Sequence, residues 1–147
     1  MRSISSDLLA TSSICVAELR YGAARHPQGE VLWERISQDV LPRVEIVPLG
    51  LPEAERAGDL IAILEARGLV IGIEDVLIGA TGLVHQRTMV TRNVDHFARI
   101  DGLGYRELVG LGSTRRSCGW REGTPEAGRR RGLACAVTRP RARPAPP

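Results

Sequence analysis

The feature that most constrains this chain is a regular alternation of short apolar segments with longer amphipathic ones. Residues 12–17, 44–47 and 88–91 have the length and the β-branched content of buried strands. Between them lie two pairs of segments with helical spacing of apolar residues, 17–25 with 30–40 and 52–68 with 73–87, and a short helical segment follows at 96–100. This order of strands and helices predicts an α/β fold with a parallel sheet.

Composition changes abruptly near residue 112. Residues 112–147 contain nine Arg, five Gly and five Pro, and with two Glu they carry a formal charge of +7. We therefore predict one folded domain over residues 1–111 and a disordered Arg/Gly/Pro-rich tail over residues 112–147. The domain itself has 11 Arg against 15 acidic residues, so it presents no overall positive field to nucleic acid.

The three cysteines and the apolar segments bear on the cellular setting. Cys15, Cys118 and Cys135 are odd in number and lack CxxC spacing, so a disulfide framework is not indicated. No apolar run approaches the roughly 18 residues of a membrane span, and the N-terminal segment lacks the apolar stretch of a signal peptide. We expect a cytoplasmic protein without a membrane partner.

Three acidic residues stand close to predicted strand ends. Glu18 follows the first strand, Asp75 begins the helix at 73–87, and Asp95 follows the strand at 88–91. In parallel α/β sheets the carboxyl ends of the strands open onto one crevice, so these carboxylates could meet there. Carboxylates are the ligands that Mg²⁺ and Mn²⁺ prefer, and such a metal can assist phosphodiester hydrolysis.

Each acid also has a structural interpretation that the residues leave open. Glu18 can be a solvated residue in the first turn of a helix, where the helix dipole favours a negative charge. Asp75 and Asp95 can be N-caps of the helices that follow them.

Three motifs add a family resemblance. The segments CVAELRYGAA, IGIEDVLIGATGL and MVTRNVDHFARIDGL, in this order, resemble the C-terminal signatures of PIN-domain VapC toxins over residues 7–108. The resemblance implies a PIN-like three-layer α/β fold with a central parallel sheet, an acidic cluster, and RNA cleavage with Mg²⁺, or with Mn²⁺ in its place. By position, Glu18 and Asp75 correspond to the second and third family acids. Asp95 is taken as the last one, shifted by one residue, because His96 stands where many members have an acid.

The beginning of the chain departs from the family pattern. Family members start with a strand that ends in Asp-Thr-Asn, which this sequence lacks, and Asp7 does not replace it. We therefore expect the first strand and one acidic ligand to be missing. A sheet without that strand has exposed backbone edges, which a neighbour should cover.

The resemblance also implies a function. It indicates a metal-dependent endoribonuclease toxin of a VapBC-type toxin-antitoxin module, with Glu18, Asp75 and Asp95 as catalytic and metal-binding residues. It further implies a homodimer that a VapB-type antitoxin inhibits. Because the first acid is missing, the alternative is a catalytically inactive fragment that binds antitoxin or dimerises. A third hypothesis is non-specific nucleic-acid binding through the Arg-rich tail, which salt would weaken steeply.

Overall fold

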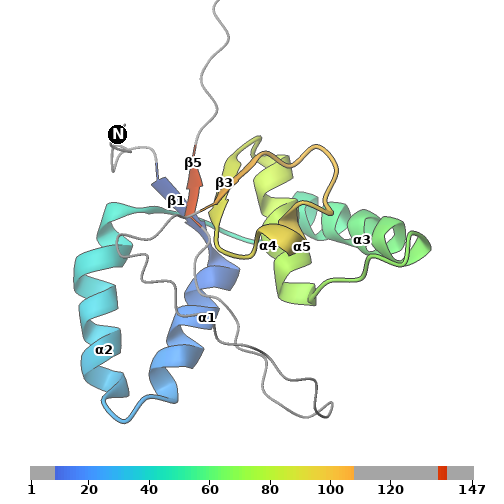
Figure 1. Ribbon diagram of the computed structural model, residues 1–147. Coiled ribbons are helices and arrows are strands. Elements are labelled where there is room, and N and C mark those ends of the chain that lie inside the picture. Colours follow the sequence, from blue (N-terminus) through green and yellow to red (C-terminus); the bar gives the residue numbers. More distant parts are fainter. Residues whose placement is uncertain (1–8, 108–135, 139–147) are drawn as a thin grey trace, which may run out of the picture.

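Helices and strands alternate through most of the chain in the computed structural model, which describes residues 9–107 and 136–138 (Figure 1). The strands are β1 (Leu9–Ser12), β2 (Glu45–Val47), β3 (Thr88–Thr91), β4 (Tyr105–Glu107) and β5 (Ala136–Thr138). The helices are α1 (Ser13–Ala24), α2 (Gly29–Arg35), α3 (Leu51–Ala66), α4 (Ile73–Val84) and α5 (Val94–Phe97). After α2 the chain continues through a π-helical turn (Ile36–Val40) and a 3₁₀ turn (Leu41–Arg43). The predicted α/β fold is confirmed.

The first strand lies earlier than the sequence pattern predicts. We expected a strand over residues 12–17, but β1 ends at Ser12 and the residues after it are helical. The reason is an N-cap: the Ser12 hydroxyl accepts a hydrogen bond from the Cys15 backbone N–H at 3.1 Å. This cap starts α1 at Ser13, so the apolar run enters the helix.

The sheet has the order β2-β1-β5-β3-β4. β1 pairs with β2 in parallel and β3 pairs with β4 in parallel, whereas β5 lies between β1 and β3 and is antiparallel to both. The predicted parallel pairing is therefore correct for two strand pairs, and the centre of the sheet is antiparallel. Residues 136–138 belong to the predicted disordered tail, so β5 is an exception to that prediction; the rest of 112–147 lies outside the described residues.

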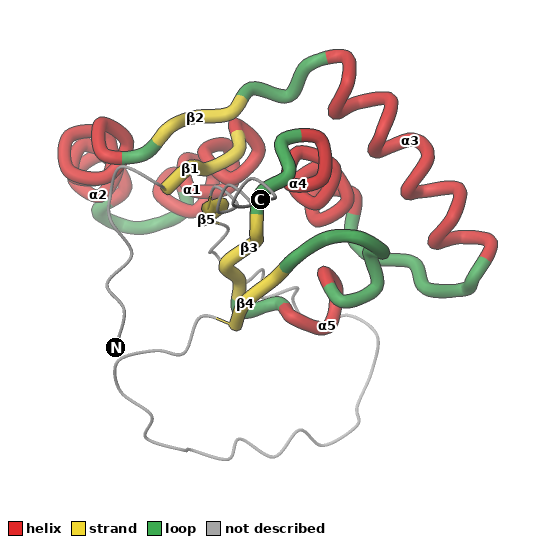
Figure 2. The backbone as a smooth tube through the Cα atoms, turned by 90° about the horizontal axis from the view of Figure 1, so that it is seen from above, coloured by secondary structure: helices red, strands yellow, loops and turns green. Residues whose placement is uncertain are grey.

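The helices gather at opposite ends of this sheet. Figures 1 and 2 show α1 and α2 as a hairpin beside β1 and β2, and α4 and α5 on the side of β3, with α3 packed against α4. Of the helices in the described ranges, none is long and apolar enough to cross a membrane.

Helix α4 forms the centre of the core, as its apolar sequence predicts. Its small residues Gly79, Ala80 and Gly82 are buried, which lets neighbouring side chains approach its backbone. A Cβ atom added to Gly79 would overlap Cδ1 of Ile100, whose side chain is itself buried. Close packing here therefore depends on the absence of a side chain at residue 79.

Replacing Gly79 tests this packing. We expect Gly79→Ala to lower the free energy of unfolding by about 1–3 kcal/mol, because an added methyl group overpacks the core. Gly58 is the matched control: it lies in α3 with no atom within 4 Å of an added Cβ, so Gly58→Ala should stabilise the protein by about 0.5–1 kcal/mol. Urea unfolding measures both, and equal effects of the two variants would contradict the packing argument.

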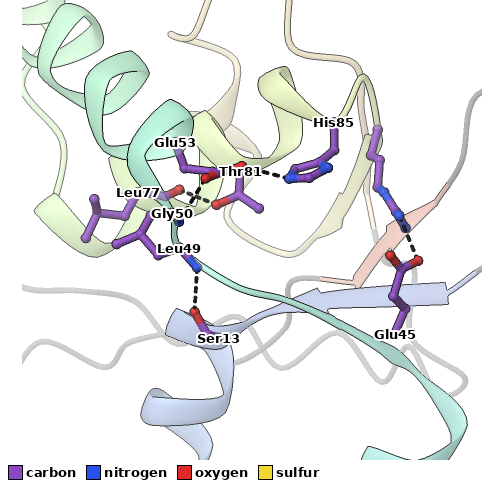
Figure 3. Close-up of polar contacts among 9 residues, drawn as sticks. Ser13, Glu45, Leu49, Gly50, Glu53, Leu77, Thr81 and His85 are labelled. Carbon is purple, nitrogen blue, oxygen red and sulfur yellow. Dashed lines mark hydrogen bonds and ion pairs between the residues drawn. The ribbon is translucent and has the colours of Figure 1, made fainter.

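A buried carboxylate joins α3 to the end of α4. Glu53 is only 5% exposed; its Oε2 accepts a hydrogen bond from the Gly50 N–H at 2.8 Å, and its Oε1 lies 2.8 Å from His85 Nε2 (Figure 3). Burial by itself raises the pKa of Glu53, but the hydrogen bonds from the Glu53 and Gly50 backbone and the contact with His85 outweigh it, so the pKa is lowered from 4.5. Glu53 is therefore held ionised at neutral pH.

The lowered pKa of Glu53 predicts a pH-dependent contribution to stability. The contribution is present above pH 4.5, the ordinary value, and is lost as the pH falls through the lowered folded-state pKa. Glu53→Gln should cost about 1 kcal/mol at pH 7, and its difference from the wild type should narrow below pH 4.5. Chemical unfolding of both proteins at pH values from about 3 to about 7 measures this effect on the free energy of unfolding. The control is Glu55→Gln on the exposed side of α3; a Glu53→Gln deficit independent of pH would exclude the mechanism.

Candidate functional site

The candidate site is built around Asp75 in the first turn of α4. The N-cap of this helix is Gly72, and no side chain caps it, so the interpretation of Asp75 as an N-cap is wrong. Its side chain is 22% exposed and points its Oδ2 toward the segment after β3. The helix dipole stabilises a negative charge at this position.

Asn93 provides one partner of Asp75. It follows β3, and its side-chain Nδ2 donates a hydrogen bond to Asp75 Oδ2 at 3.0 Å. Its backbone N–H donates to Oγ1 of Thr91, a buried residue at the end of β3, at 3.0 Å. The buried threonine thus fixes the turn that presents the Asn93 amide to the carboxylate.

His96 provides the second partner. Its Nδ1 lies 2.6 Å from the same Asp75 Oδ2 atom, and its side chain is 38% exposed. Sequence reasoning named His96 as the residue that stands where many family members have an acid, but did not assign it to the site. The available signal was its position directly before Phe97 in the motif MVTRNVDHFARIDGL.

Buried neighbours hold α5 in place. Phe97, directly after His96, is fully buried, and Ile100 is 3% exposed. Arg99 Nη1 donates to the Val70 carbonyl at 3.2 Å, which joins this segment to the loop before α4. The position of His96 relative to Asp75 is therefore set by core packing on one side and by a loop contact on the other.

The structure places the other two predicted acids on α1 and α5. Glu18 is half-buried in α1, whose first turn holds no acidic residue, so neither the position directly after the strand nor the first-turn interpretation is correct. Asp95 is exposed in the first turn of α5, and the N-cap there is Asn93, so Asp95 is not the cap. From α5, the side chain that reaches Asp75 is that of His96.

The donor atoms as they lie do not form a metal centre. Within residues 9–107 and 136–138, no three His, Cys, Asp or Glu side chains are grouped closely enough to hold a metal ion. Asp75 supplies a hard oxygen ligand, but both neighbours contact its Oδ2. In this arrangement Asp75, Asn93 and His96 form a hydrogen-bonded triplet around one carboxylate oxygen.

Comparison with known proteins identifies the family. A family model described as "PIN domain" matches residues 2–103. The chain belongs to the PIN-domain family, and the α/β fold with Asp75 at the start of its central helix agrees with the motifs from which that resemblance was inferred.

Curated relatives of this chain include proteins named as VapC ribonucleases. "Ribonuclease VapC2" of Rickettsia felis is 34% identical over 99 residues, which cover 67% of this chain and 72% of the relative. The crystal structure of VapBC2 from Rickettsia felis bound to a DNA fragment from its promoter matches with a TM-score of 0.63 at 34% identity, covering 67% of this chain and 73% of that one. FitAcB from Neisseria gonorrhoeae matches with a TM-score of 0.65 at 30% identity, covering 69% of this chain and 76% of that one.

The position of His96 generates a prediction about cation binding. His96→Asp places a carboxylate beside Asp75, and a second hard oxygen ligand should raise the affinity for Mn²⁺ roughly tenfold, or about 1.4 kcal/mol. His96→Asn is the matched control, since an asparagine side chain has nearly the size of an aspartate side chain but carries no charge. Isothermal titration calorimetry with Mn²⁺ measures both variants. Equal affinities would mean that residue 96 does not face a cation site.

Proposed function

We propose that the chain is an endoribonuclease toxin of a VapBC-type toxin-antitoxin module, which hydrolyses RNA phosphodiester bonds in the cytoplasm. The observation that carries this proposal is the family match over residues 2–103, together with relatives named as VapC ribonucleases at 34% identity. The site adds a specific candidate, because Asp75 lies at the start of the central helix and is oriented by Asn93 and His96.

We further propose that the activity depends on Mg²⁺, which Mn²⁺ can replace, with Asp75, Glu18 and Asp95 as the catalytic and metal-binding carboxylates. The support is the chemistry of these groups, since carboxylate oxygens are the ligands that both ions prefer. The described arrangement groups no three such side chains, but Mg²⁺ needs only one or two carboxylates when waters and substrate phosphates complete its coordination.

A VapB-type antitoxin is the proposed partner, and a homodimer is the proposed assembly. Support for the partner comes from the solved neighbours, which include VapBC complexes from Rickettsia felis and Salmonella typhimurium. Asp75 is partly exposed beside Asn93 and His96, so a guanidinium group from a partner could pair with its carboxylate.

The second candidate is a catalytically inactive protein that binds antitoxin or dimerises. The observation that favours it is the contact between His96 and Asp75, because an imidazole occupies the space next to the carboxylate where a further acid would serve as a ligand. The family fold does not depend on catalysis, so binding can persist without it.

RNA cleavage by the purified full-length chain tests the proposal. We expect cleavage of a labelled single-stranded RNA with Mg²⁺ or Mn²⁺ and none with EDTA. Asp75→Asn should lower the cleavage rate by about 100-fold or more, because even outer-shell partners of a metal contribute about 10–100-fold. Asp59→Asn is the matched control, since Asp59 is exposed on α3, and it should cleave like the wild type.

The outcomes separate the two candidates. Cleavage that requires the metal and Asp75 supports the ribonuclease. A folded wild-type chain, judged by circular dichroism, that cleaves no RNA under any of these conditions would rule the ribonuclease out in favour of the inactive binding protein. Cleavage that survives both EDTA and Asp75→Asn would contradict the assigned site.

A further inference from the structure

The centre of the sheet is formed by a strand from a distant part of the chain. β5 pairs on one side with β1, where Thr138 lies opposite Leu9 and Val137 opposite Ala10. On its other side it pairs with β3, where Thr138 lies opposite Thr88 and Val137 opposite Met89. β1 and β3 are therefore joined in the sheet through β5 (Figure 1).

The backbone edges that face β5 need a partner. Ala10 and Met89, which flank Val137, are both fully buried with β5 in place, so the backbone groups that face β5 have it as their partner. A buried N–H or C=O group without a hydrogen bond destabilises the fold by about 1–3 kcal/mol. The interval between β1 and β3 thus requires an extended segment of peptide.

Contacts that do not involve β5 hold the two sides of this interval together. Arg87, directly before β3, is buried and forms an ion pair of 2.7 Å with Glu45 at the start of β2 (Figure 3). Near the other end of β2, the Leu49 N–H donates to Ser13 Oγ at 3.1 Å, which joins the chain after β2 to α1 (Figure 3). Packing of α3 on α4 completes the link, because α3 follows β2 and α4 precedes β3.

Chain connectivity restrains β5 only weakly. A connection of 28 residues, 108–135, separates β4 from β5. The entropy of closing such a loop changes slowly with its length, by about 0.6 kcal/mol for each doubling, so the pairing must come mainly from the strand and its neighbours. The position of β5 between β1 and β3 is therefore a matter of peptide recognition by a sheet.

We propose that the interval between β1 and β3 is an acceptor site for an extended peptide strand, and that residues 136–138 of the same chain are its occupant. The occupant connects the half of the fold that carries Glu18 to the half that carries Asp75, Asn93 and His96. The proposal does not depend on ribonuclease activity, because it concerns only strand pairing.

Engineered disulfides in the full-length chain test the acceptor site. In a background with Cys15, Cys118 and Cys135 replaced by Ser, two variants pair a cysteine at Thr138 with a cysteine at a facing position: Leu9→Cys/Thr138→Cys and Thr88→Cys/Thr138→Cys. Residues opposite each other in antiparallel strands have Cα atoms about 4.5–5.5 Å apart, within the range of a disulfide. After mild oxidation, we expect an intramolecular disulfide in each variant, detected as a faster monomer band on a non-reducing gel. Formation of both bonds locates residue 138 between the two strands.

The matched control is Leu9→Cys/Val137→Cys, which is out of register by one residue. Successive side chains point to opposite faces of a sheet, so this pair should form at least about tenfold less disulfide. A second check adds Val137→Pro to the Leu9→Cys/Thr138→Cys variant. Proline lacks the N–H needed for pairing, so the crosslink should fall to the control level, whereas Ala127→Pro should leave it unchanged.

Each result supports or overturns the proposal. Intramolecular crosslinks to both residue 9 and residue 88, lost with Val137→Pro, support it. Crosslinks that appear only between chains would show that a second copy supplies the strand, and so would overturn the assignment to the same chain. Equal crosslinking of the in-register and out-of-register pairs would overturn the acceptor site. The triple-serine background is included alone, and its thermal unfolding must match the wild type.

Discussion

Backbone hydrogen bonding across the centre of the sheet is the interaction that joins the two pairs of parallel strands into one sheet. β1 with β2 and β3 with β4 are each parallel pairs, and neither pair hydrogen-bonds directly to the other. A three-residue strand, β5, closes the ladder between them. α1 follows β1, and α4 and α5 precede and follow β3, so the helices that carry the candidate residues adjoin the two sides of that central position.

The fold fixes the Asp75 carboxylate together with the two side chains that contact it. Asp75 is held by the start of a buried helix, and Asn93 and His96 are held by a buried threonine and a buried phenylalanine. The contacts within this triplet are hydrogen bonds to one oxygen atom, Asp75 Oδ2. These hydrogen bonds satisfy Asp75 Oδ2 without a cation. At residue 96 the acid that the family resemblance implies is therefore replaced by a side chain that stabilises the carboxylate locally.

Local pattern predicted the elements whose burial is reflected in their own sequence. The helices α3 and α4 and the strand β3 have a clear period or a clear apolar run, and Asp75 was identified through its place at the start of α4. The strand assigned to residues 12–17 was wrong because one hydrogen bond from Ser12 decided the helix start. β4 was missed because its residues, Tyr-Arg-Glu, are exposed and form no apolar run, unlike the equally short β2, and β5 was missed because it lies in an arginine-rich region. Contacts across distant segments, such as His96 with Asp75, depend on tertiary packing, which a local pattern does not contain.

The order of the strands in the sheet has a consequence for synthesis. A ribosome makes β5 after every other described strand, yet β5 occupies an interior place in the sheet. While residues up to Glu107 have emerged and Ala136 has not, the facing edges of β1 and β3 have no partner from their own chain among the described strands. Contacts between residues so far apart in sequence also form slowly. The nascent protein therefore passes through a stage in which the middle of its sheet is open, and the sheet is completed only after residues 136–138 have been made.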